Sequence, residues 1–119
     1  LKAHKVKVAN ISIRHAKADP GTLLAWARED TFALVIYYRQ GVSPSERAAV
    51  GDWTRQLIDL AIAHQGSYYL PYQIHASREQ FLAAYPRAGE FFALKERVDP
   101  TNKFRNKLWD AYYLQPSGQ

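Results

Sequence analysis

The sequence predicts an α+β domain in which a mainly antiparallel sheet has helices packed on one face. Near the beginning of the chain, segment 5–15 has alternating β-branched residues, and segment 31–39 is apolar at both parities. Two capping boxes, SPSE at 43–46 and SREQ at 77–80, each precede a segment with helical periodicity. Hydrophobic residues make up 47% of the 119 residues, which is typical of one globular domain.

The first strand is expected over residues 5–15, KVKVANISIRH. The apolar positions change parity in the middle of this segment, which predicts a bulge near Ala9-Asn10. Beyond the bulge, Ser12 and Arg14 share one face of the strand and the isoleucines share the other.

A turn is expected at ADPGT (18–22), where Pro and Gly are adjacent. The following residues, LLAWARED (23–30), suit either a short helical turn or an irregular connection. TFALVIYYR (31–39) is apolar at both parities and therefore predicts a central strand that is covered on both faces.

The first capping box predicts a helix of about five turns that ends near His64, with Gly66 as its stop signal. SYYLPYQIH (67–75) looks like a strand, but Pro71 restricts it to a sheet edge or interrupts it there.

The second capping box predicts a short helix that ends near Pro86, and residues 87–98 predict another helix. We expect Asp99 to cap a last helical segment beginning at Pro100, with Phe104 anchored in the core. The tail QPSGQ (115–119) is expected to fray.

The residues required for several kinds of site are absent from this sequence. Cysteine is absent, so disulfides and thiolate metal sites are excluded, and a cytoplasmic location is expected. The four His residues do not have metal-ligand spacing, so no metal site is expected, and there is no Gly-rich phosphate loop. No run of about 18 apolar residues indicates a membrane span. The net charge of +5 is compatible with an anionic partner, but the basic residues are dispersed as on an ordinary solvated surface.

The chain contains no Met and begins LKAHKVKV, with strand-like residues almost at once. We therefore expect residues 1–119 to be the C-terminal part of a longer protein. The polar side chains on its strands have two interpretations. They form a solvated sheet face with ordinary aromatic packing, or they form a face that donates hydrogen bonds to a polyhydroxylated ligand.

The segment LKERVDPTNKFRN (94–106) resembles the C-terminal end of FAD-linked oxidases of the vanillyl-alcohol oxidase superfamily, especially the berberine-bridge type. The matching residues are Lys95, Asp99, Pro100, Phe104 and Asn106. Upstream, NISIRH (10–15) and GSYYLPYQIHASREQFLAAYP (66–86) resemble the branch that oxidises sugar lactones, alditols and decaprenylphosphoryl ribose.

The resemblance implies that residues 1–119 are a single cap, or substrate, domain, and that the FAD-binding domain lies elsewhere in the full-length protein. It implies the oxidation of an alcohol of a sugar-, lactone- or polyol-like substrate by hydride transfer to FAD. The isolated domain is then expected to be inactive. Its exposed apolar surface is expected to cause self-association, with a homodimer as one form.

The resemblance also implies roles for individual residues. Candidates for substrate binding are Arg14, Ser12, Tyr38 and Gln73, and candidates for catalysis are His75 and Tyr72. The family places a Lys on the later strand near the flavin, but the corresponding segment here, LPYQIH, has none. Tyr72, Gln73 or His75 would take its place. The residues expected to contact the cofactor are Asn106, Lys95 and Arg105.

Two other interpretations remain. One is a stand-alone interaction domain of ferredoxin-like layout, with its basic charge contacting RNA. The chain lacks clustered basic residues and a Gly-aromatic RNA-binding motif, so no nucleic-acid partner is expected. The other is a structural cap in an enzyme that has lost its activity.

Overall fold

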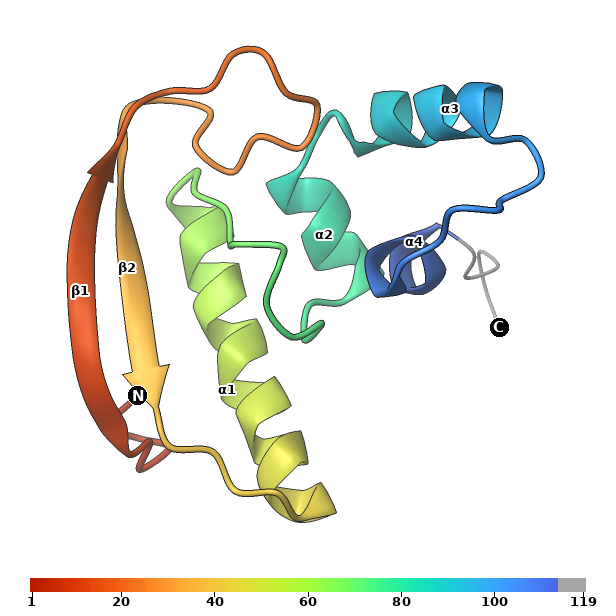
Figure 1. The fold of residues 1–119 in the computed structure, drawn as a ribbon. Coiled ribbons are helices and arrows are strands. Elements are labelled where there is room, and N and C mark those ends of the chain that lie inside the picture. The colour runs from red at the N-terminus through yellow and green to blue at the C-terminus, as the bar shows by residue number, and fades with distance from the viewer. Residues whose placement is uncertain (114–119) are drawn as a thin grey trace.

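A computed structural model describes residues 1–113 as a β-hairpin followed by four helices (Figure 1). The elements are β1 (Val8–Ala16), β2 (Thr31–Tyr38), α1 (Pro44–Ala63), α2 (Arg78–Ala84), α3 (Ala88–Val98) and α4 (Lys107–Tyr112). The helices all lie on the β2 side of the hairpin, and β1 is the outermost element (Figure 1). The α+β class with an antiparallel sheet is thus confirmed. The tail expected to fray lies outside the described residues.

The two strands pair with the register Ile11 to Ile36 and His15 to Phe32. The pairing is irregular between Val8 and Asn10, at the site of the predicted bulge. One face of the hairpin therefore carries the isoleucines of β1, and the opposite face carries the polar side chains between them.

The expectation that β2 is a central strand covered on both faces is wrong. The sheet has two strands, so β1 and β2 are both edge strands. Phe32 and Leu34 are 67% and 63% exposed. The apolar residues of β2 would suit a larger sheet, but residues 1–113 supply no third strand to pair with it. For the same reason, the described residues lack the four strands of a ferredoxin-like layout.

The segment between the strands is an irregular connection with the predicted turn at its start. The carboxylate of Asp19 accepts hydrogen bonds from the backbone amides of Gly21 (3.0 Å) and Thr22 (3.1 Å). Lys17 bonds Asp30 and closes the base of the loop at 2.7 Å. Ala25 and Ala27 are buried, so the loop packs against the part of the chain that holds α1 to α4, which we call the helical half.

Both capping boxes are present, and each begins a helix as predicted. Ser43 caps α1 reciprocally with Glu46, and Ser77 caps α2 reciprocally with Gln80. The end of α1 is also as expected, because the amide of Gly66 bonds the carbonyl of Ala61 at 2.7 Å.

The core lies in the helical half. The Phe81 ring stacks on Tyr112 with centroids 4.3 Å apart. Tyr85 and Phe92 also pack on the Phe81 ring, with centroid distances of 5.5 and 6.0 Å. Ile58 of α1 and Trp109 of α4 complete this cluster. No strand residue belongs to it, so the core forms where α1, α2, α3 and α4 meet.

The predicted strand over 67–75 is wrong. This segment is irregular and turns at 70–72, around Pro71. Without a neighbouring strand, a Tyr-rich segment interrupted by Pro has no ladder to join. Its side chains pack individually, as Tyr68 does against Tyr85 at 5.6 Å.

The helix over 87–98 is confirmed as α3, but the start of the last helix was predicted wrongly. Asn106, not Asp99, caps α4, which begins at Lys107. Residues 99–106 form a loop, and Phe104 is 79% exposed, so it does not anchor the core. The Asp99 carboxylate accepts hydrogen bonds from the backbone amides of Lys103 and Phe104. A helix starting at Pro100 would need these two amides for its own backbone hydrogen bonds.

Within residues 1–113, none of the helices is both long enough and apolar enough to cross a membrane.

Candidate functional site

The structure brings Tyr38 and Gln73 together through a third residue, Gln40. The Gln40 Oε1 atom accepts hydrogen bonds from the Tyr38 hydroxyl at 3.3 Å and from Gln73 Nε2 at 3.1 Å. Tyr38 and Gln40 come from the end of β2, and Gln73 comes from the loop before α2. The Tyr38 ring meets Trp53 of α1 edge-on at 4.8 Å, which fixes its position.

Sequence reasoning missed Gln40. Its signal was present, because Gln40 follows Tyr38 by two residues and this spacing puts both side chains on one side of an extended chain. Together, the three side chains offer amide donors, an amide oxygen and a hydroxyl, which are the groups that bind hydroxyls of a neutral polar ligand.

His75 lies at the end of the same loop, against α1. A Cβ atom added to Gly51 would lie 3.6 Å from His75 Nδ1, an ordinary contact distance, so the ring lies beside Gly51 of α1. The His75 carbonyl accepts a hydrogen bond from Arg55 Nη1 at 3.2 Å. Burial, and to a lesser extent the charge of Arg55, lower the pKa of His75.

His75 Nε2 is buried and has no hydrogen-bond partner within residues 1–113. A lowered pKa keeps the imidazole neutral near pH 7, and a neutral ring nitrogen without a partner is able to accept a proton. Tyr72, the other catalytic candidate, is 66% exposed and packs edge-on against Tyr69 at 5.1 Å.

Ser12 and Arg14 lie apart from this group. In the hairpin they pair with Val35 and Ala33, on the face opposite to Tyr38. Arg14 is also about 17 Å from Tyr38 along the sheet, since Tyr38 lies five positions beyond Ala33, the residue that pairs with Arg14. One small ligand therefore does not reach both groups.

The three candidates for cofactor contact gather around the loop between α3 and α4. Asp99 organises this loop, because its carboxylate accepts from the amides of Lys103 (3.0 Å) and Phe104 (2.9 Å) and pairs with Lys95. The ammonium group of Lys95, followed by the amide of Phe104, lowers the pKa of Asp99 to about 2. Lys95 Nζ also lies 4.8 Å from the centroid of the Trp109 ring.

Asn106 and Arg105 have structural partners as well. Asn106 Oδ1 accepts from the amide of Trp109 at 2.9 Å, and Arg105 Nη2 lies 2.8 Å from Asp110. The arrangement only partly fits a flavin contact. Lys95 is committed to Asp99 and Trp109, whereas Asn106 and Arg105 are exposed and keep further N–H donors.

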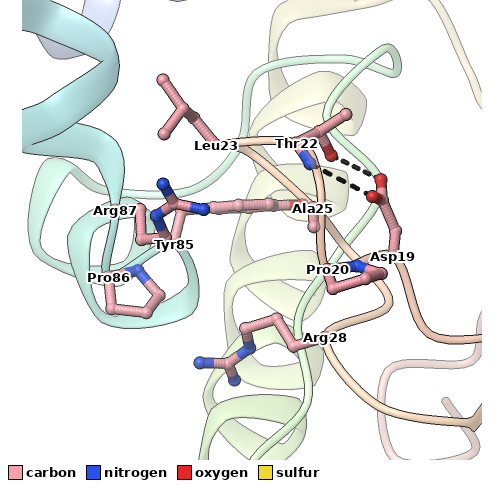
Figure 2. A pocket seen from close by; sticks show the side chains of 9 residues that line it. All are labelled: Asp19, Pro20, Thr22, Leu23, Ala25, Arg28, Tyr85, Pro86 and Arg87. Carbon is pink, nitrogen blue, oxygen red and sulfur yellow. Dashed lines mark hydrogen bonds between the residues drawn. The ribbon is translucent and has the colours of Figure 1, made fainter.

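A separate cavity of about 240 Å³ lies between the inter-strand loop and the start of α3 (Figure 2). Figure 2 shows Asp19 turned toward Thr22, while Arg28 donates to the carbonyl of Gln65 at 2.9 Å. Arg87 forms an ion pair with Glu90 at 2.9 Å. None of the predicted site residues lines this cavity, whose charged groups are all bonded within the chain.

Comparisons of the chain with protein-family models, with curated proteins and with solved structures give no match.

Proposed function

We propose that this chain is the substrate-side, C-terminal domain of an FAD-linked oxidoreductase that oxidises an alcohol of a sugar-, lactone- or polyol-like substrate. The support from sequence is the ordered resemblance of three segments, of which 94–106 is the most specific. The support from structure is the uncovered apolar face of the hairpin, where Ile13, Phe32 and Leu34 are 68%, 67% and 63% exposed. Contiguous apolar surface of this kind marks an interface, and an FAD-binding domain of the same polypeptide would cover it.

In this proposal, Tyr38, Gln40 and Gln73 bind the hydroxyls of the substrate. These residues already form one hydrogen-bonded group, so little side-chain entropy is lost when a ligand orders them. Ser12 and Arg14 lie on the opposite face and do not reach the same ligand.

His75 is the proposed base. FAD, when bound, supplies the oxidising power by accepting the hydride that leaves the alcohol carbon. His75 would accept the proton of the alcohol as the alcohol is converted to a carbonyl, and its Nε2 atom, which is buried in this structure, would have to become accessible to the substrate. The lowered pKa of His75 favours this role, because it keeps the imidazole unprotonated before the reaction.

The cofactor would be held mainly by the FAD-binding domain. From this chain, Asn106 and Arg105 are the residues with exposed donors that could reach it. Lys95 would act indirectly, by holding the loop between α3 and α4 in place through Asp99.

The test is the absorption spectrum of the complete protein that contains this chain. We expect a flavin spectrum, and a colourless protein that does not take up added FAD would refute the proposal. If flavin is bound, Gln73→Ala should lower kcat/KM for the substrate while leaving the FAD content unchanged. Arg14→Ala serves as the comparison, because a larger loss there would move the substrate to the opposite face of the hairpin.

A further inference from the structure

A groove of about 990 Å³ runs beside α1, outside the cavity of Figure 2. The N-terminal segment (residues 4–7) and the end of β2 line it together with α1. His4 bonds Gln56 of α1 at 2.9 Å, and the amide of Arg39 bonds the carbonyl of Lys7 at 2.9 Å. These contacts connect the segments that form the groove.

Three of the four Lys and Arg side chains that line the groove form no ion pair within residues 1–113, and the fourth, Arg55, pairs with Asp52. The three are Lys5, Lys7 and Arg39. All three are exposed, so a ligand in the groove has access to them.

The carboxylates of the groove, by contrast, are bonded to neighbouring side chains. Asp52 accepts from Arg55, and Asp59 accepts from Gln80, each at 2.5 Å. Glu46 accepts from the hydroxyl of Ser43 at 2.6 Å and from its amide at 3.1 Å. These bonds, with a smaller contribution from Lys7, lower the pKa of Glu46. Glu46 and Asp59 accept from uncharged groups and keep their negative charge, but four Lys and Arg side chains and three acidic side chains line the groove, so their net charge is +1.

The backbone at Lys5 adds an independent observation. Lys5 has a φ of 50°, in the left-handed region that residues other than Gly rarely adopt. A tight turn holds it there, with the amide of Lys5 bonded to the carbonyl of Lys2 at 3.0 Å. A strained residue at the rim of a groove is a common feature of ligand sites.

We propose that this groove binds a small molecule through an oxyanion group, phosphate or carboxylate, held by Lys5, Lys7 and Arg39. Ammonium and guanidinium groups form charge-assisted hydrogen bonds with such oxyanions. The groove is at the upper end of the size range of small-molecule sites. Tyr38 and Gln40, which the proposed function assigns to the substrate, also line the groove, so the oxyanion would lie next to the proposed substrate site. The proposal does not depend on the proposed oxidation.

The test is a titration of the 119-residue chain, labelled with ¹⁵N, with inorganic phosphate and separately with citrate, at an ionic strength kept constant with NaCl. We expect saturable amide shifts at residues 4–7 and 38–41, and the tighter of the two probes identifies the oxyanion. The double variant Lys5→Gln/Lys7→Gln should weaken this binding at least tenfold. Lys103→Gln, an exposed cation on the loop before α4, is the matched control and should leave the affinity unchanged.

Shifts that do not saturate, or that spread over the surface with both probes, would overturn the proposal. So would equal affinity in the double variant and in the control. The amide spectrum of each variant, compared with the unchanged chain before any ligand is added, separates loss of binding from loss of the fold.

Discussion

The hairpin and the helical half use the same kind of residues in opposite ways. In the helical half, Phe81, Tyr85 and Trp109 are 0%, 1% and 2% exposed. In the hairpin, Phe32 has the same side chain as Phe81 and is 67% exposed. The difference arises because Phe81 of α2 lies in a core to which α1, α3 and α4 also contribute residues, whereas a two-stranded sheet has no second layer over Phe32. The helical half therefore carries most of the folding free energy of the described residues, and the hairpin leaves its apolar side chains exposed.

The largest expected effect is that of Phe81→Ala, compared with the same change at Phe32. Phe81→Ala removes a ring that stacks on Tyr112, so it should lower the free energy of unfolding by about 3–5 kcal/mol. Phe32→Ala, at an exposed position, should change it by about 0.5 kcal/mol or less. Urea unfolding followed by tryptophan fluorescence measures both. Equal losses of unfolding free energy would contradict the conclusion that the helical half, and not the hairpin, carries most of the stability.

Asp99→Asn should have a smaller effect than Phe81→Ala, and one that depends on pH. The pKa of Asp99 is lowered to about 2, so its carboxylate stabilises the fold at every pH above its ordinary value of 3.8. This stabilisation is lost as the pH falls through the folded pKa. The Tm difference between the two proteins should thus be full at pH 7 and begin to shrink below pH 3.8. A difference that stays constant down to pH 3 would assign the effect to packing instead. Asp110→Asn, in an exposed ion pair with Arg105, is the control and should barely change Tm.

Asn106→Ala removes one hydrogen bond, between the Asn106 side chain and the Trp109 amide, and so tests how much this cap stabilises α4. Loss of the cap on α4 should lower the free energy of unfolding by about 1 kcal/mol. Asn106→Asp retains a capping oxygen and should restore most of it. If the alanine variant unfolded like the unchanged chain, the cap would contribute nothing, and Asn106 would be free for another role.

The smallest effect on stability is expected for Ile13→Thr, on the open face of the hairpin. The exposed side chain keeps its β-branch, so the free energy of unfolding should change by about 0.5 kcal/mol or less. Self-association in sedimentation velocity should decrease, because the apolar face becomes smaller. Leu60→Ser, at an exposed position of α1, is the control and should not alter self-association. The reverse result would place the associating surface on α1.

Local patterns predicted the elements whose cause is local. The capping residues at Ser43 and Ser77 each bond the third residue of the helix that follows, so four residues suffice to recognise them. The bulge near Asn10 was visible as a change of parity within one strand. The candidate site was predicted in part: Tyr38 and Gln73 were identified, but Gln40, which bonds both, was not.

Patterns misled where the outcome depends on distant residues. Residues 67–75 have the composition of a strand, but a strand exists only when another strand pairs with it. Asp-Pro is a common helix start, but the Asp99 carboxylate pairs with Lys95 and bonds two loop amides instead. Phe104 was expected in the core, but this loop leaves its ring exposed.

The sequence by itself determined the α+β class, the starts of α1 and α2, and the existence of two strands with a bulge in the first. These follow from hydrogen bonds and side-chain alternation within a few residues of each other. Only the tertiary structure decided which aromatic rings are buried, that Arg14 and Tyr38 lie on opposite faces, and that Asp99 closes a loop rather than caps a helix. Burial and pairing depend on which segments meet in space, and that is a property of the whole fold.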